Sequence, residues 1–227
     1  MKFTNTKDLA MDNGVKVLAY GLAGSGKTFT IRTADEPSLI ISAESGLLSL
    51  ADVSVDAVEV DSFDDLEKIY TYLCKSEESQ KYKWICIDSL SEVSEVLLMR
   101  ELERNKDGRK AYGEVSTRTQ AMVRKFRDLP RNVYMTCKME RQKDEFTGGI
   151  LCYPSMPGNK LGQALPYLFD EVFALRVEKD GEGVLRHMFQ TSSDAKYYAK
   201  DRSGKLSQFE KPNLAAIRAK IMESENV

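Results

Sequence analysis

The sequence predicts an α/β fold in which helices flank a mainly parallel central sheet, and three observations support this prediction. Apolar runs of strand length alternate with longer amphipathic segments along the 227-residue chain, as expected when helices join parallel strands. A glycine-rich turn connects the first apolar run to a helical segment. Two late apolar runs separated by Asp180-Gly181 predict an antiparallel hairpin near the C-terminus.

Length and composition are those of one globular domain covering residues 1–227. With 42% hydrophobic and 30% charged residues, the chain can bury a substantial core. The net charge of −2 excludes a uniformly basic surface for nucleic acid, although one face can still be basic. No stretch approaches the length of an apolar membrane span and the N-terminus has no apolar signal segment. We therefore expect a cytoplasmic protein without a membrane partner.

The cysteines indicate neither a disulfide framework nor a zinc site. Cys74, Cys86, Cys137 and Cys152 lie far apart, form no C-x-x-C pair and are accompanied by a single histidine, His187. At least two of them fall inside apolar, strand-like runs. We expect reduced thiols that serve as small hydrophobic side chains.

The first half of the chain alternates strands with helices. The predicted strands cover 15–20, 38–42, about 57–60 and 84–87, and the predicted helices cover about 27–33, 63–75 and 91–104. Pro37 opens the second strand. Ser62, with Asp65 three residues later, forms a capping-box-like pattern at the start of the second helix.

The second half begins with a polar, glycine-containing connection at 105–113. A helix over about 114–128 follows and is terminated by Pro130. After a strand at 133–137, the segment from Met139 to Gly162 is rich in glycine, proline and charge, and is predicted to be irregular. The remaining elements are the hairpin of 172–177 and 184–190 and a C-terminal helix over about 213–224.

The turn after the first strand matches the phosphate-binding pattern G-x-x-x-x-G-K-[ST]. Glycines let successive backbone N–H groups point at phosphate oxygens, and the next helix directs the positive end of its dipole at them. The Lys27 ammonium is expected on the outer phosphates and the Thr28 hydroxyl on Mg²⁺. The sequence therefore predicts ATP with Mg²⁺ as the ligand. The expected nucleotide contacts are Gly21, Ala23, Gly24, Ser25, Gly26, Lys27, Thr28 and Phe29.

Two acidic residues are expected at the same edge of the sheet, because parallel strands present their ligands at their carboxyl ends. Asp88 ends the buried run 84–87. It is predicted to hold Mg²⁺ through a coordinated water with Ser89 orienting the site, the alternative being a simple helix cap. Glu44 directly follows the strand 38–42. It is predicted to activate the water that attacks the γ-phosphate, the alternative being a solvated loop residue.

Three segments together resemble the RecA core: the phosphate loop GLAGSGKT, a strand running into SAESGL, and an ICIDSL strand. The resemblance implies a RecA-like fold, water activation by Glu44 and an Mg²⁺-linked Asp88. More narrowly, residues 14–210 are similar to short, phage-encoded ATP-binding proteins related to RecA that act in single-strand annealing and recombination. The stretches PSMPGNKLGQALPYLFDEVFAL and AKDRSGKL belong to this likeness. For a phage-encoded protein, the expected location is the cytoplasm of a bacterial host.

By the same resemblance, two DNA-contacting loops fall near 105–112 and 140–162. Tyr112, Phe146 and Tyr153 offer aromatic faces on which unpaired bases can stack. The alternative is that these charged loops are only solvated. The expected DNA contacts are Lys106, Arg109 and Lys110 in the first loop and Arg141, Lys143 and Lys160 in the second.

Two further regions bear on catalysis. Where the RecA core has an amide side chain that senses the nucleotide, this chain has Thr136, Cys137 and Lys138. Coupling between ATP and DNA is therefore either different here or a task of Lys138. Lys200 and Arg202 resemble the lysine-x-arginine fingers by which RecA-core ATPases reach the γ-phosphate of a neighbouring subunit, the alternative being exposed turn residues.

The expected function is an ATPase, stimulated by single-stranded DNA, that assembles on that DNA as a ring or filament and promotes annealing or homologous recombination. A single-strand DNA-binding protein is a further expected partner. Two other classes stay open: a P-loop small-molecule or nucleotide kinase, and a non-hydrolysing loader or regulator that uses ATP as a switch. A signalling GTPase is disfavoured because the guanine-reading N-K-x-D pattern is absent.

Overall fold

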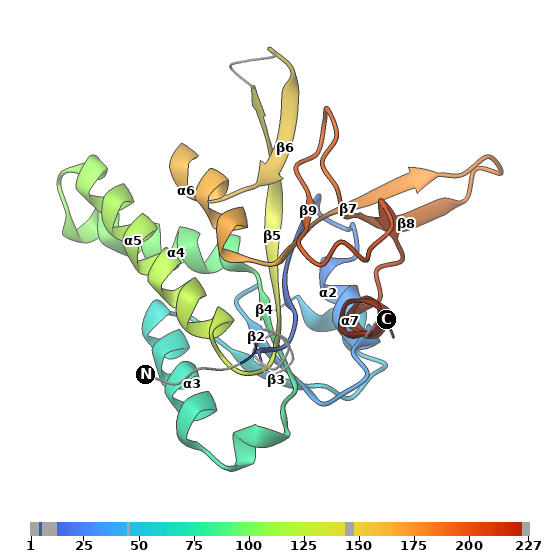
Figure 1. Ribbon diagram of the computed structural model, residues 1–227. Coiled ribbons are helices and arrows are strands. Elements are labelled where there is room, and N and C mark those ends of the chain that lie inside the picture. The colour runs from blue at the N-terminus through green and yellow to red at the C-terminus, as the bar shows by residue number, and fades with distance from the viewer. Residues whose placement is uncertain (1–4, 6–12, 45, 144–147, 224–227) are drawn as a thin grey trace.

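The structure is a computed structural model that describes residues 5, 13–44, 46–143 and 148–223 (Figure 1). Its strands are β1 (Lys16–Gly21), β2 (Ser38–Ser42), β3 (Asp56–Glu59), β4 (Trp84–Asp88), β5 (Asn132–Lys143), β6 (Ile150–Pro154), β7 (Glu171–Lys179), β8 (Leu185–Gln190), β9 (Lys200–Asp201) and β10 (Phe209–Glu210). Its α-helices are α2 (Lys27–Thr30), α3 (Phe63–Lys75), α4 (Leu90–Arg104), α5 (Gly108–Arg127), α6 (Asn159–Ala164) and α7 (Leu214–Met222). Four 3₁₀ turns are η1 (Ile31–Thr33), η2 (Leu47–Leu50), η3 (Glu78–Lys81) and η4 (Leu165–Leu168).

The sheet has the strand order β10-β8-β7-β1-β5-β4-β2-β3, with β9 paired to β7 and β6 paired to β5. The six strands from β3 to β7 in this order run parallel, and β8 and β10 extend the sheet in antiparallel pairing. The predicted α/β fold, with its mainly parallel sheet and C-terminal antiparallel hairpin, is confirmed. One parallel strand, β5, lies between β1 and β4.

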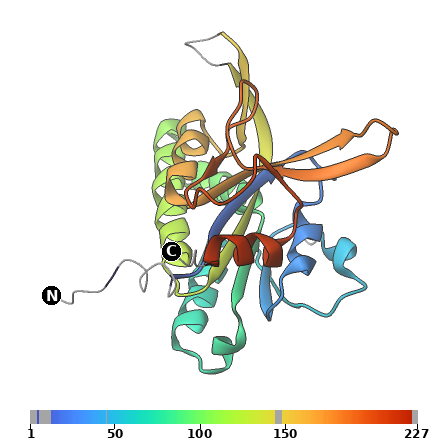
Figure 2. The same ribbon diagram turned by 45° about the vertical axis from the view of Figure 1, so that its right-hand side comes forward.

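The core lies on both faces of this sheet. Along β1, Leu18 and Tyr20 pack into one cluster and Val17 and Ala19 into the other, as the alternation of side chains along a strand requires. Helices α3, α4 and α5 cover the first face, and α2 and α7 cover the second (Figures 1 and 2). No helix in the described part of the chain combines the length and apolar character needed to cross a bilayer.

The structure corrects two predictions about irregular segments. The connection expected at 105–113 is short, because α5 already begins at Gly108, where the Asp107 carboxylate caps it by accepting a hydrogen bond from the Arg109 N–H at 2.9 Å. The segment expected to be irregular from Met139 to Gly162 contains the end of β5, strand β6 and most of α6. Burial of Cys152 against the core gives this hairpin its support. Phe146 lies outside the described residues.

Candidate active site

The turn between β1 and α2 has the shape of a phosphate loop. Gly24 and Gly26 have positive φ angles of 73° and 100°, a region that glycine enters at little cost. Gly21 is required for a different reason, since an added Cβ would lie 2.6 Å from the Ser25 Oγ and 2.8 Å from the Leu175 carbonyl oxygen. The turn therefore needs glycine at three positions, and it leads directly into the first turn of α2, whose N–H groups have no intrahelical partner.

Lys27 is the first residue of α2, and its ammonium group lies at this loop. The Nζ donates hydrogen bonds to the carbonyl oxygens of Gly21 and Leu22, both at 3.0 Å. Burial lowers the pKa of Lys27, while the charges of Asp88 and Glu44 act in the opposite direction. The lysine is thus close enough to both acidic residues to interact with them electrostatically.

Asp88, at the end of β4, has a carboxylate that accepts hydrogen bonds from two hydroxyl groups. It is buried, with 4% of its surface exposed. The Thr28 hydroxyl donates a hydrogen bond to its Oδ2 at 2.6 Å, and the Thr136 hydroxyl, from β5, donates to its Oδ1. A hydroxyl group paired with a carboxylate is a set of hard oxygen donors of the kind that Mg²⁺ prefers. The residues present therefore fit an Mg²⁺ ion beside the phosphate loop.

Glu44 lies beside Asp88 at the same edge of the sheet. The Ala43 N–H donates a hydrogen bond to the Asp88 carbonyl oxygen at 2.9 Å, which joins the ends of β2 and β4. Glu44 is exposed, and its carboxylate accepts a hydrogen bond from the Ser89 hydroxyl. Ser89 follows Asp88 through a cis peptide bond and is also the N-cap of α4. Because the Ser89 hydroxyl donates to the Glu44 carboxylate, Ser89 is in position for the orienting task expected of it.

Three contacts at the loop were not predicted from the sequence. Besides Thr136, the Tyr134 hydroxyl donates to the Lys27 carbonyl oxygen at 3.1 Å, and the His187 Nδ1 lies 2.8 Å from the Ser25 carbonyl oxygen. All three residues come from strands that are distant in sequence from the loop. The sheet register places them here: Cys86 of β4 pairs with Tyr134, which brings Thr136 level with the end of β4, and His187 of β8 pairs with Val177 of β7.

Lys138, considered above as a sensor, is engaged with α4. Its Nζ forms ion pairs with Glu92 at 2.9 Å and Glu95 at 2.7 Å. Burial alone would lower the pKa of Lys138, but the hydrogen bonds to these two carboxylates outweigh it and raise that pKa. Lys138 therefore connects the middle of β5 to the first turns of α4.

The two expected finger residues lie away from the loop of their own chain. Lys200 on β9 pairs with Val172 near the amino end of β7, whereas the loop lies at the carboxyl edge of the sheet. Its Nζ donates to the carbonyl oxygens of Pro166 at 2.9 Å and Phe169 at 2.5 Å. Arg202 is exposed and forms an ion pair with Asp170 at 2.5 Å. Both side chains therefore contact residues of their own chain.

The six expected DNA contacts are all exposed and fall in two groups. Lys106, Arg109 and Lys110 lie at the start of α5, while Arg141 and Lys143 on β5 and Lys160 on α6 surround the β5–β6 hairpin. The two groups lie near each other, as a contact between their neighbours shows. Tyr112 follows the first group on α5, and a Cβ added to Gly158, just before Lys160, would lie 3.3 Å from the Tyr112 ring.

We compared the chain with protein families, with curated proteins and with solved structures. A sequence model of the AAA domain family matches residues 13–203. No curated protein matches the chain. Among solved structures, 254 chains match, including the crystal structure of a KaiC-like protein from the hyperthermophilic archaeon Pyrococcus horikoshii OT3. That chain is 14% identical, with coverage of 78% of this chain and 77% of the other and a TM-score of 0.43.

Proposed function

Because the chain belongs to the AAA domain family and has its P-loop ATPase fold, we propose that it binds ATP with Mg²⁺ at the loop Gly21–Thr28 and hydrolyses the γ-phosphate. The observation that supports this most is the linked set of side chains at one sheet edge. Thr28 is hydrogen-bonded to Asp88, and Glu44 is held beside Asp88 through Ser89. The set combines a metal-binding pair with a separate carboxylate.

The loop and Lys27 have the task of binding the phosphates. The Lys27 ammonium, now shared between two loop carbonyls, would turn to the outer phosphate oxygens, which are better acceptors because they carry charge. Thr28 and Asp88 would hold Mg²⁺, which when bound offsets phosphate charge as a Lewis acid. Thr136 keeps the Asp88 carboxylate oriented by its hydrogen bond.

Glu44 is the general base of the proposal. Its carboxylate is exposed at the mouth of the site and oriented by Ser89, so it can accept the proton of a water that attacks the γ-phosphorus. Acid–base catalysis of this kind contributes roughly 10²- to 10⁴-fold to a rate. Glu59 ends the neighbouring strand β3, is also exposed and pairs in register with Ser42, which makes it a matched control position.

We further propose that single-stranded DNA stimulates the hydrolysis and that the protein assembles on it to promote annealing or recombination. The resemblance to RecA-type proteins and the exposed cations of α5, β5 and α6 support this part. If a cation of one subunit reaches the γ-phosphate bound by its neighbour, we assign that role to Arg202 rather than Lys200. The Lys200 ammonium already donates to two carbonyl oxygens of its own chain.

Phosphate release, measured with and without single-stranded DNA, tests the proposal. Release that DNA stimulates agrees with it, transfer to a small acceptor would assign a kinase, and ATP binding without turnover would assign a switch. Glu44→Gln should bind a fluorescent ATP analogue normally and hydrolyse ATP roughly 100-fold or more slowly, while Glu59→Gln should behave as wild type. Normal hydrolysis by Glu44→Gln would remove Glu44 from the reaction.

A further inference from the structure

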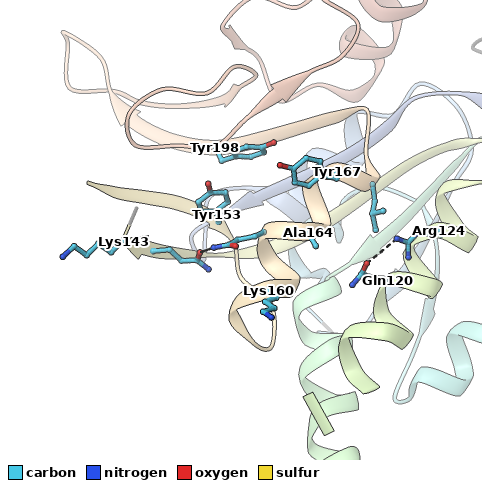
Figure 3. A pocket seen from close by; sticks show the side chains of 11 residues that line it. Gln120, Arg124, Lys143, Tyr153, Lys160, Ala164, Tyr167 and Tyr198 are labelled. Atoms are coloured by element: carbon cyan, nitrogen blue, oxygen red, sulfur yellow. Dashed lines mark hydrogen bonds between the residues drawn. The ribbon is translucent and has the colours of Figure 1, made fainter. Parts of the chain in front are cut away.

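A cavity of about 830 Å³ lies between α5, the β5–β6 hairpin, α6 and η4 (Figure 3). Its volume is near the upper end of the range of small-ligand pockets. The described residues that line it include three cations and no carboxylate. The side chains that matter most are Arg124, Lys143, Lys160, Tyr153, Tyr167 and Tyr198.

The tyrosines give the cavity an aromatic wall. Tyr153 and Tyr198 stack with ring centroids 5.3 Å apart and an interplanar angle of 22°. Tyr167 is 76% exposed, although an aromatic side chain is usually at least half covered. Figure 3 shows the three rings gathered on one side of the cavity, with Gln120 and Arg124 of α5 opposite them. The cavity therefore offers flat apolar surfaces next to positive charge.

One face of α5 leads into this cavity. Tyr112, Ser116, Gln120 and Arg124 are spaced four residues apart, so each lies next to the following one in a row that winds slowly around the helix. The Gln120 amide donates to the Ser116 hydroxyl at 3.2 Å, and Arg124 donates to the Gln120 amide oxygen at 3.4 Å. Twelve residues of helix span about 18 Å. This face therefore connects the cations at the start of α5 to the tyrosines.

We propose that a single strand of DNA follows this face of α5 and places bases in the cavity. The bases stack on Tyr167 and on the Tyr153–Tyr198 pair, and Arg124 and Lys160 contact the phosphates. A basic path lined by aromatic rings suits an unpaired strand, because the base faces of a duplex are already stacked on one another. The inference rests on the proposed function and adds the path that the DNA follows. It includes three contact residues, Arg124, Tyr167 and Tyr198, that lie outside both DNA-contacting loops implied by the resemblance.

Fluorescence anisotropy of a labelled oligo(dT) of about 15 nucleotides, a length near the upper site size of one binding fold, tests the path. Tyr167→Ala should weaken binding roughly 10-fold with an unchanged salt dependence, and Tyr167→Trp should restore it. The double variant Arg124→Gln/Lys160→Gln should reduce the slope of log K against log [salt] by about 1.4, since each phosphate contact on a single strand contributes about 0.7.

The matched control is Lys75→Gln/Lys83→Gln, which removes two exposed cations at the amino edge of the sheet. This variant should bind as wild type, and all variants should keep the wild-type rate of ATP hydrolysis without DNA. If wild type binds oligo(dT) and the cavity variants bind it equally well, the path is wrong although the proposed function stands. If wild type binds no oligo(dT), the path and the DNA-dependent part of the proposed function are both wrong, whereas ATP hydrolysis is not affected. Equal displacement of the oligonucleotide by duplex DNA would overturn the assignment to a single strand.

Discussion

Replacing Glu171 by glutamine should stabilise the protein at neutral pH. Glu171 begins β7, is 1% exposed and pairs in register with Asp201 of β9. Asp201 accepts hydrogen bonds from the N–H groups of Ser203, Gly204 and Leu206, which stabilise its ionised form. Burial first, and then the charge of Asp201, raise the pKa of Glu171 to about 8. We therefore expect Glu171 to be protonated in the folded protein at pH 7.

The size of the effect follows from linkage. A carboxyl whose pKa rises from 4.5 to about 8 on folding contributes stability that is fully present below the unfolded pKa and is lost as pH rises toward the folded one. The slope is about 1.4 kcal/mol per pH unit, so roughly 3 kcal/mol is lost by pH 7. Glutamine is neutral, has the same shape and can donate to Asp201. The variant should therefore exceed wild type by less than about 1 kcal/mol near pH 5 and by roughly 3 kcal/mol at pH 7.

Urea unfolding between about pH 5 and pH 8 measures this difference. Trp84 is the only tryptophan in the sequence and is fully buried in β4, so its fluorescence reports the loss of the core. Glu182→Gln, at an exposed position in the turn between β7 and β8, is the control and should change stability by less than about 0.5 kcal/mol. Identical pH dependence in wild type and Glu171→Gln would refute the reasoning, because it would mean that Glu171 is ionised in the folded state.

Two further predictions concern the active site. Thr136→Val removes the hydroxyl that donates to Asp88, and a hydrogen bond to a charged group contributes about 1.5–3 kcal/mol. The Mg²⁺ concentration for half-maximal ATP hydrolysis should rise roughly 10-fold or more, and an unchanged Mg²⁺ titration would show that Thr136 does not orient the carboxylate. Gly21→Ala places a Cβ 2.6 Å from the Ser25 Oγ and should weaken binding of a fluorescent ATP analogue roughly 10-fold. Gly113→Ala in α5, where an added Cβ meets nothing within 4 Å, is its control and should leave nucleotide affinity unchanged, so equal affinity for both variants would reject the steric argument.

Much of the fold could be predicted because its signals are local. The apolar runs at 38–42 and 84–87 match β2 and β4 closely, since strands buried on both faces are continuously apolar. The capping pattern of Ser62 also holds, with the Ser62 hydroxyl accepting a hydrogen bond from the Asp65 N–H at 3.2 Å. The nearness of Glu44 to Asp88 followed from two strand ends that meet at one edge.

What the sequence did not indicate depends on tertiary packing. Helix α5 begins earlier than its glycines suggest, because Ala111 and Val115 are fully buried and their packing outweighs the low helix propensity of Gly108 and Gly113. The contact between Thr136 and Asp88 requires the register of β4 against β5, which no local pattern encodes. The hydrogen bonds of Lys200 likewise join residues that are more than 30 positions apart.

Strand β5 belongs to two different environments. Its first half is enclosed between β1 and β4, and its last five residues pair with β6 in the projecting hairpin. The seven residue steps from Thr136, which contacts Asp88, to Lys143, at the cavity, span about 23 Å of continuous backbone. The cavity and the Asp88 carboxylate therefore both contact strand β5. If an occupant of the cavity changes the affinity of the protein for Mg²⁺-ATP by some factor, Mg²⁺-ATP must change the affinity for that occupant by the same factor.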